Sequence, residues 1–156
     1  MDINETMMQG LRPIDAVPIR LKGYRRSFNL KPSWRKGSGR SIAVLNVEYC
    51  SGSWINGVCL LLESGELAAL DTRERGYNRE GVPAERLECY LQYDLPDDTP
   101  FFIYIGKEEK IDSQILPNKD YLDVCMAGAS SWGEDFFDEF VATTYLASGE
   151  PLNNKI

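Results

Sequence analysis

The sequence predicts a mixed α+β fold, a small twisted sheet or barrel of about five to seven strands with flanking helices. Two observations lead to this prediction. Residues 17–105 contain short apolar or alternating segments separated by Gly, Pro, Ser and Asp, a pattern typical of strands and turns. After residue 117, apolar residues recur at helical spacing. This mixture favours helices packed on a sheet over an all-helical bundle.

The strand-rich part of the chain begins at residue 17. Five strands are expected, at 17–28, 41–48, 54–62, 86–93 and 100–105. Turn signals separate them at 36–39, 51–53, 81–83 and 95–98. A short helix is expected earlier, over residues 2–9, because Gly10 and Pro13 end its pattern.

Two helices are expected near the C-terminal end, over residues 119–130 and 133–145. The second carries an apolar stripe that we expect to cover the sheet: Phe136, Phe137, Phe140, Val141 and Tyr145. A chain of 156 residues is long enough for one domain with its own core. We expect that domain over residues 1–147, followed by a loose polar tail at 148–156.

The charge of the chain and its lack of histidine exclude several classes of function. The net charge is −7 and the isoelectric point is about 4.7, whereas binding to nucleic-acid phosphates requires a cationic face. Without histidine, Ser-His and Cys-His nucleophilic relays and histidine metal sites are excluded. Acid–base chemistry therefore falls to Asp, Glu, Tyr, Cys or Lys.

The four cysteines, Cys50, Cys59, Cys89 and Cys125, are widely spaced and form no Cys-x-x-Cys pair. We interpret them as reduced core thiols of a cytoplasmic protein rather than as metal ligands, disulfides or nucleophiles. No apolar segment is long enough to span a membrane, and the first residues lack the pattern of a signal peptide. The sequence thus predicts neither a membrane partner nor a nucleic-acid partner.

Glu74 is the carboxylate that stands out. It follows an apolar run typical of a strand, and then a helix of about three turns with Ser64 as its expected N-cap and Gly76 as its end. Leu67, Leu70 and Glu74 share the inward face of that helix. Burial and the negative end of the helix dipole both disfavour the ionised carboxylate, as a group that exchanges protons near neutral pH requires.

A second interpretation of Glu74 stays open from the residues alone. The end of the helix frays, and Glu74 points to solvent in an ordinary surface salt bridge. Its partner is then one of three neighbouring cations: Arg73, Arg75 or Arg79. The two interpretations differ in how much of the Glu74 side chain water reaches.

Several segments, taken together, resemble the γ-glutamylcyclotransferase-like family. The resemblance covers about residues 1–146, and the segments that carry it are Leu21-Lys22-Gly23-Tyr24-Arg25-Arg26-Ser27-Phe28, the run from Gly57 to the step Leu70-Asp71-Thr72-Arg73-Glu74, Gly76-Tyr77-Asn78-Arg79, Pro117-Asn118-Lys119-Asp120-Tyr121 and Cys125-Met126-Ala127-Gly128-Ala129. The resemblance implies the fold of that family, with no metal and no cofactor. It also implies that Glu74 is the catalytic glutamate.

Members of this family cyclise a γ-glutamyl group, so the resemblance implies release of 5-oxoproline and of the amine or peptide attached to it. The substrate's α-amine is the nucleophile, but it is protonated near neutral pH. Glu74 is expected to take that proton, let the nitrogen attack the γ-carbonyl, and then protonate the leaving amine. The motifs concern only the γ-glutamyl half, so the leaving group stays open among glutathione, γ-glutamyl amino acids and γ-glutamyl amines.

Two tyrosines are the other candidate site residues. Tyr121 matches a pocket tyrosine of the family and is expected to bind substrate, and Tyr104, near the end of an expected strand, is expected to line the same cavity. Both also fit an amphipathic core residue with its hydroxyl at the surface. Asp71, although it belongs to the motif, is interpreted as a helix-surface or capping residue rather than as a second catalytic acid.

The chain departs from the family in one motif. The family holds the γ-glutamyl group with backbone N–H groups of a Tyr-Gly-Ser turn after its first strand, and no Tyr-Gly-Ser occurs here. Either that segment lies upstream of Met1 or it is lost. Its loss is expected to leave a strand with an unpaired edge, which favours a homodimer, and little or no activity in the chain as given. The alternative function is a non-catalytic small-molecule-binding or interaction protein of the same fold.

Overall fold

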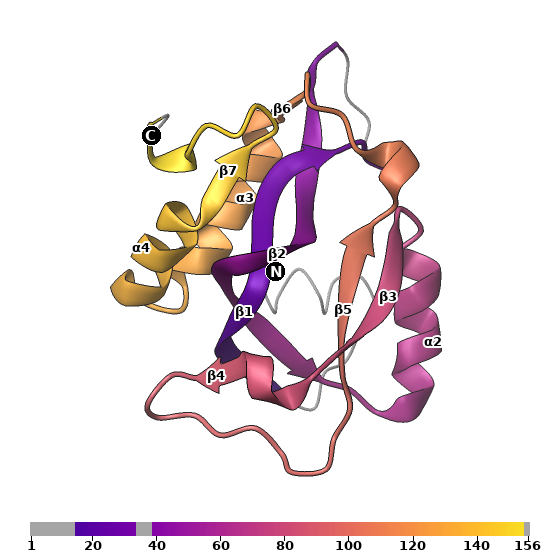
Figure 1. Cartoon of the computed structure of the whole chain (residues 1–156), viewed down its shortest axis with the longest axis vertical. Helices are drawn as coiled ribbons and strands as arrows, with labels where there is room; N and C mark the ends of the chain where they lie inside the picture. Colours follow the sequence, from indigo (N-terminus) through magenta and orange to yellow (C-terminus); the bar gives the residue numbers. More distant parts are fainter. Residues whose placement is uncertain (1–14, 34–38, 155–156) are drawn as a thin grey trace.

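The structure is a computed structural model that describes residues 15–33 and 39–154. The helix expected over residues 2–9 lies outside the described residues, as does most of the turn expected at 36–39. Within the described ranges the prediction of a mixed α+β fold is confirmed, because helices lie on both sides of a central pair of long strands (Figure 1).

Two long antiparallel strands form the centre of the molecule. β1 (Asp15–Leu30) pairs with β2 (Ser41–Leu61) over most of its length. The other edge of β1 holds β4 (Leu87–Cys89) in antiparallel and, further along, β7 (Thr144–Leu146) in parallel orientation. β6 (Leu116–Pro117) pairs with the start of β2, so the order of the main sheet is β4-β1-β2-β6 with β7 beside β1.

A second, two-stranded sheet and the helices complete the fold. β3 (Tyr77–Val82) and β5 (Phe101–Gly106) pair in antiparallel orientation. In Figure 1 they share one side of the molecule with α2 (Ser64–Arg73), whereas α3 (Lys119–Ser130) and α4 (Glu134–Ala142) lie on the other side with β7. Short 3-10 turns connect these elements at Ala84–Arg86, Glu108–Lys110 and Leu152–Asn154.

The strands expected at 41–48 and 54–62 are one strand, β2. Both halves pair with β1, and the register shifts where Lys22 faces Trp54 and Tyr24 faces Tyr49. The residues between, which include Gly52 at φ +83°, form a bulge rather than a reversal of the chain. The prediction of a turn at 51–53 was therefore wrong, because these residues form a bulge within one strand. A bulge made of small polar residues has the same composition as a turn.

Other boundaries also differ from the predictions. β3 was not expected, because four of its six residues are polar or exposed and it lacks an apolar pattern. Within 86–93 only Leu87–Cys89 is a strand. The helix expected over 133–145 ends at Ala142, and Tyr145 belongs to β7. The tail expected to be loose is anchored, because Leu152 is fully buried in the core.

Two groups of buried apolar residues stabilise this arrangement. One lies between β1 and the C-terminal helices and includes the expected stripe residues Phe136, Phe140 and Val141. The other lies at the far end of β1 and includes Val17, Ile19 and Ile55. Among the described residues, no helix has both the length and the apolar character needed to cross a lipid bilayer.

Candidate active site

Glu74 lies at the junction between α2 and β3. Its backbone N–H donates to Leu70 O at 2.9 Å, so Glu74 caps the helix, and its carbonyl accepts from Tyr77 N at 3.0 Å in the turn that begins β3. Gly76 is buried in this turn, and a Cβ there would lie 2.8 Å from Ser33 Oγ, so a larger residue would require the Ser33 side chain to move. The helix start differs from the expectation, because the N-cap is Glu63 and no side chain caps the helix.

The Glu74 carboxylate is largely shielded from water. Its side chain is 16% exposed, and Arg73 donates to Oε1 from Nε at 3.2 Å and from Nη2 at 2.9 Å. Both contacts use Oε1, and within the described part of the chain Oε2 accepts no hydrogen bond. The salt bridge to Arg73 thus agrees with the interpretation of Glu74 as a surface residue. The low exposure of its side chain agrees with the interpretation that Glu74 faces inward.

The three side chains singled out from the sequence line one cavity of about 320 Å³. Glu74, Tyr104 and Tyr121 reach it from three separate parts of the fold: the end of α2, β5 and α3. Its other walls come from β1, β2 and α4. A cavity of this volume is in the range that takes small molecules. The structure therefore brings the predicted residues together, while their roles in chemistry stay predictions.

Tyr121 holds the main chain of β2. Leu45 N donates to the Tyr121 hydroxyl at 3.3 Å, and the Tyr77 hydroxyl donates to Leu45 O at 2.7 Å. Burial, as the largest cause, raises the pKa of Tyr121 well above its ordinary value, so the hydroxyl keeps its proton. The Leu45 peptide is therefore bound by two tyrosine hydroxyls, whereas the unpaired strand edge and the homodimer expected from the sequence stay predictions.

The hydroxyl of Tyr104, the second predicted tyrosine, is bound to a residue of α2. The hydroxyl donates to Asp71 Oδ1 at 2.6 Å, and Asp71 also pairs with Arg79 at 3.5 Å. Burial, followed by the hydrogen bond to Asp71, raises the pKa of Tyr104. Asp71 is exposed on the surface of α2, in the position that the sequence interpretation gave it.

Arg26 is a cavity residue that sequence reasoning did not select as a site residue. Its side chain is 6% exposed, its guanidinium lies 4.2 Å over the Phe140 ring, and burial lowers its pKa to about 9. The available signal was the alternation of β1, because Tyr24, Arg26 and Phe28 occupy alternate positions and both aromatic neighbours are typical of a buried face. Arg26 follows them into the interior.

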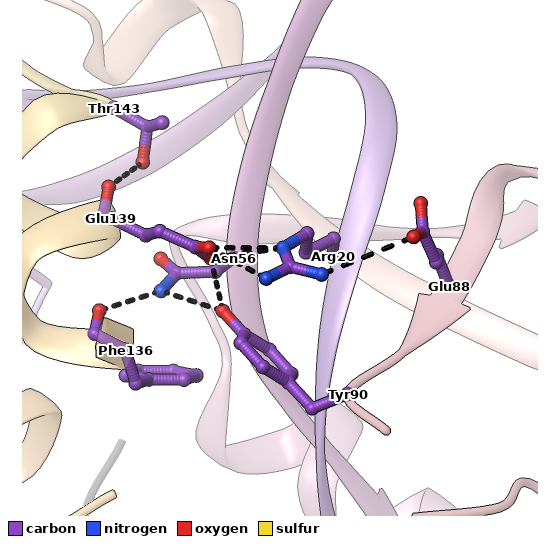
Figure 2. A network of polar contacts seen from close by, with 7 residues as sticks. All are labelled: Arg20, Asn56, Glu88, Tyr90, Phe136, Glu139 and Thr143. Carbon is purple, nitrogen blue, oxygen red and sulfur yellow. Dashed lines mark hydrogen bonds and ion pairs between the residues drawn. The ribbon is translucent and has the colours of Figure 1, made fainter. Parts of the chain in front are cut away.

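Asn56 connects Arg26 to a second polar cluster, which Figure 2 shows. Asn56 Oδ1 accepts from Arg26 Nη2 at 3.0 Å. In Figure 2, Asn56 Nδ2 donates to Phe136 O at 2.8 Å and to the Tyr90 hydroxyl at 3.4 Å. The Tyr90 hydroxyl in turn donates to Glu139. Through Asn56 and Tyr90, the cavity arginine is thereby connected to the Glu139 carboxylate on α4.

Glu139 is the acidic centre of that cluster. Arg20 donates to it from Nη2 at 2.6 Å and from Nε at 3.0 Å. Burial acts to raise the pKa of Glu139, but the hydrogen bonds from Arg20 and Tyr90 outweigh it and hold that pKa below its ordinary value. Burial and the Glu139 bond raise the pKa of Tyr90 to about 12.

The four cysteines form no disulfide, and each is partly buried rather than in the core. Cys125 lines the cavity, and Cys50 lies 3.3 Å from Ser53 Oγ. In the ranges that the structure describes, no three Cys, Asp or Glu side chains gather as a metal site would require.

Comparison with known proteins finds a likeness in structure but not in sequence. No protein-family model matches the chain, and no curated protein matches it. A solved structure of a γ-glutamyl cyclotransferase superposes with a TM-score of 0.63 at 15% identity, over 91% of this chain and 81% of that one. The solution structure of an Arabidopsis thaliana protein gives a TM-score of 0.47 at 18% identity, over 85% and 78%. The first likeness establishes the architecture: the chain has the fold of γ-glutamyl cyclotransferases.

Proposed function

We propose that this protein catalyses a γ-glutamyl cyclotransferase-type acyl transfer, which converts a γ-glutamyl amine or peptide into 5-oxoproline and the free amine. One observation carries the proposal. Glu74, the carboxylate that the sequence resemblance assigns to catalysis, lines a cavity of about 320 Å³ with a side chain only 16% exposed. A shielded carboxylate on a cavity of ligand size is the arrangement that proton transfer to and from a bound amine requires.

The proposed reaction uses Glu74 first as a base and then as an acid. Its carboxylate takes a proton from the α-ammonium group of the substrate, and the freed nitrogen adds to the γ-carbonyl carbon to form a five-membered ring. The C–N bond to the leaving amine then breaks, and the protonated Glu74 returns its proton to that amine. The ring nitrogen also loses its second hydrogen as a proton, which the departing amine takes up to leave as an ammonium ion. Protons then balance over the cycle, and no other reactant is consumed.

Arg73 orients the base in this scheme. Both of its hydrogen bonds to Glu74 go to Oε1, which leaves Oε2 to face the substrate amine. Arg73 is therefore a positioning residue, which touches the base and not the reacting atoms.

The alternative function is non-catalytic binding of a small molecule, and the sequence observation that favours it is the absence of Tyr-Gly-Ser. Both functions require binding of a small molecule, but only the first converts a γ-glutamyl substrate into product. Incubation of the chain with γ-glutamyl dipeptides and with glutathione, followed by quantification of 5-oxoproline by mass spectrometry, separates them. Production of 5-oxoproline supports catalysis, with the cradle supplied by other residues.

The variant Glu74→Gln tests the assigned base. The amide keeps the shape of the side chain but cannot accept the ammonium proton, so we expect turnover to fall by about 10²–10⁴ while substrate affinity changes little. Glu80→Gln is the matched control, because it is the same substitution at an exposed position of the adjacent strand β3 and should retain full turnover. Full turnover by Glu74→Gln would rule out the mechanism.

A further inference from the structure

The lining of the cavity is cationic although the protein is acidic. Among the described residues, its lining holds four cationic side chains and one carboxylate, in a chain of net charge −7. The cations are Arg26, Lys31, Arg73 and Arg75, and the carboxylate is Glu74. A cationic cavity in an acidic chain favours an anionic ligand.

Three of the four cations are paired or reach solvent. Lys31 pairs with Asp112 at 3.4 Å and its side chain is 48% exposed. Arg73 is bound to Glu74, and Arg75 is exposed and donates to a backbone carbonyl, Thr72 O. Their charges are compensated by a carboxylate or by water.

Arg26 differs from all three. It is buried, and among the described residues no carboxylate lies within ion-pair distance of it. Five neutral acceptors surround its guanidinium instead: Asn56 O, Asn56 Oδ1, Phe140 O, Thr143 Oγ1 and Thr144 Oγ1. A buried cation without an anion carries an unrecovered desolvation cost, which is also why the pKa of Arg26 falls to about 9.

The donors of Arg26 leave room for one more acceptor. A guanidinium has five N–H groups: one on Nε and two on each Nη. Nε donates to Thr144, and Nη2 has three acceptors for its two hydrogens. Nη1 has two hydrogens and, within the described part of the chain, one acceptor, Asn56 O. One N–H of a rigidly held cation that lines the cavity therefore stays available for a further acceptor.

We propose that Arg26 binds the carboxylate of a small anionic ligand in this cavity. The ligand supplies the negative charge that Arg26 lacks, in a site shielded from water where a charge-assisted hydrogen bond is strong. This inference rests on the proposed function for the identity of the carboxylate, which is the α-carboxylate of the γ-glutamyl group. That group then meets one charge at each end of its α-carbon: Glu74 for the amine and Arg26 for the carboxylate.

The assignment also supplies a donor of the kind that a Tyr-Gly-Ser turn provides, a motif that these 156 residues do not contain. A backbone cradle holds its anion with N–H groups, and the Arg26 fork offers the same kind of donor with a full charge added. The neutral acceptors from α4 and β2 fix that fork in place before a ligand arrives. Preorganisation of this kind reduces the entropic cost of binding.

The test uses the full chain and two probes that differ only in charge: 5-oxoproline and its uncharged amide, 5-oxoprolinamide. We expect the wild type to bind 5-oxoproline at least about tenfold more tightly in an NMR titration, a ratio that corresponds to about 1.4 kcal/mol. We also expect the Arg26 Nε–Hε signal to move on addition of 5-oxoproline but not of the amide. In Arg26→Gln the affinity ratio should fall to about one, whereas in Arg20→Gln, the same substitution on β1 outside the cavity lining, it should persist.

The wild-type titration decides the matter even where Arg26→Gln fails to fold. Equal affinity for the two probes, or selective binding without movement of the Arg26 signal, overturns the proposal, as does failure of both probes to bind. Selective binding with a shifted Arg26 signal supports it whether or not the chain turns over γ-glutamyl substrates. Loss of the proposed activity and loss of the Arg26 site are thus separate outcomes.

Discussion

Arg20 and Arg26 lie on the same strand, β1, but in opposite electrostatic surroundings. Arg20 is 31% exposed and meets two carboxylates, Glu139 at 2.6 Å and Glu88 at 3.9 Å, and the Glu139 hydrogen bond raises its pKa. Arg26 is almost fully buried and meets only neutral acceptors, and burial lowers its pKa to about 9. The charge of Arg20 is paired with carboxylates of the protein, whereas Arg26 is held in place without a counterion among the described residues.

The difference between the surroundings of Arg20 and Arg26 indicates a structural role for the first and a ligand-binding role for the second. A paired arginine at a partly exposed edge stabilises the fold and needs nothing further. A buried arginine held only by neutral groups lowers the stability of the fold, because its charge is removed from water. An apolar side chain of similar size would fill the same space without this desolvation cost. Buried charged residues that destabilise the fold in this way are found mainly at ligand-binding and catalytic sites.

The largest expected effect is on stability, from comparing Arg26→Met with Arg20→Met. Loss of Arg26 leaves several buried acceptors without a donor, at about 1–3 kcal/mol for each, so we expect the free energy of unfolding to fall by at least about 3 kcal/mol. Loss of Arg20 should cost about 1–2 kcal/mol, because Glu139 keeps its bond from Tyr90 and water reaches the pair. Urea denaturation at pH 7 measures both. Equal losses would show that the two surroundings are energetically alike.

A smaller effect is expected from Glu139→Gln, and it should depend on pH. The pKa of Glu139 is held below its ordinary value of 4.5, so the unfolded chain binds a proton more readily than the folded one. The stabilisation by the carboxylate is therefore present above about pH 4.5 and is lost as pH falls through the folded pKa. We expect Gln to cost about 1–2 kcal/mol at pH 7 and nothing in strong acid. A difference that stays constant from pH 7 to pH 3 would contradict the ionised pair.

The smallest effect is expected from Tyr90→Phe, which removes the hydroxyl between Asn56 and Glu139. Loss of this hydrogen bond should cost about 1 kcal/mol at pH 7. The pKa of Tyr90 is raised to about 12 from an ordinary value of 10, so the wild type should lose stability from this group as pH rises above 10. The Phe variant should lack that part of the alkaline loss in urea titrations at pH 9, 10 and 11. Parallel pH profiles for the two proteins would count against the Tyr90–Glu139 bond.

The predictions from sequence succeeded where a local pattern had one meaning. The strand at 100–105 and the helix at 119–130 match β5 and α3 closely, because their periodicities are uninterrupted. The predictions failed where the same amino-acid composition is compatible with two different local structures. The Ser-Gly-Ser segment suits a bulge as well as a turn, and the polar strand β3 has no apolar alternation to mark it.

The sequence by itself determined the features that depend on residues a few positions apart. The helix that ends at Glu74 belongs to this class. The partner of Glu74, in contrast, stayed open among three arginines until the structure placed Arg73 on its carboxylate. Only the tertiary structure decided that Arg26 lacks a counterion and lines the same cavity as Glu74 and Tyr121. The reason is separation along the chain: the acceptors that hold Arg26 lie 30 to 118 positions away, on β2, on α4 and just beyond it, and no local pattern records which of them folding brings together.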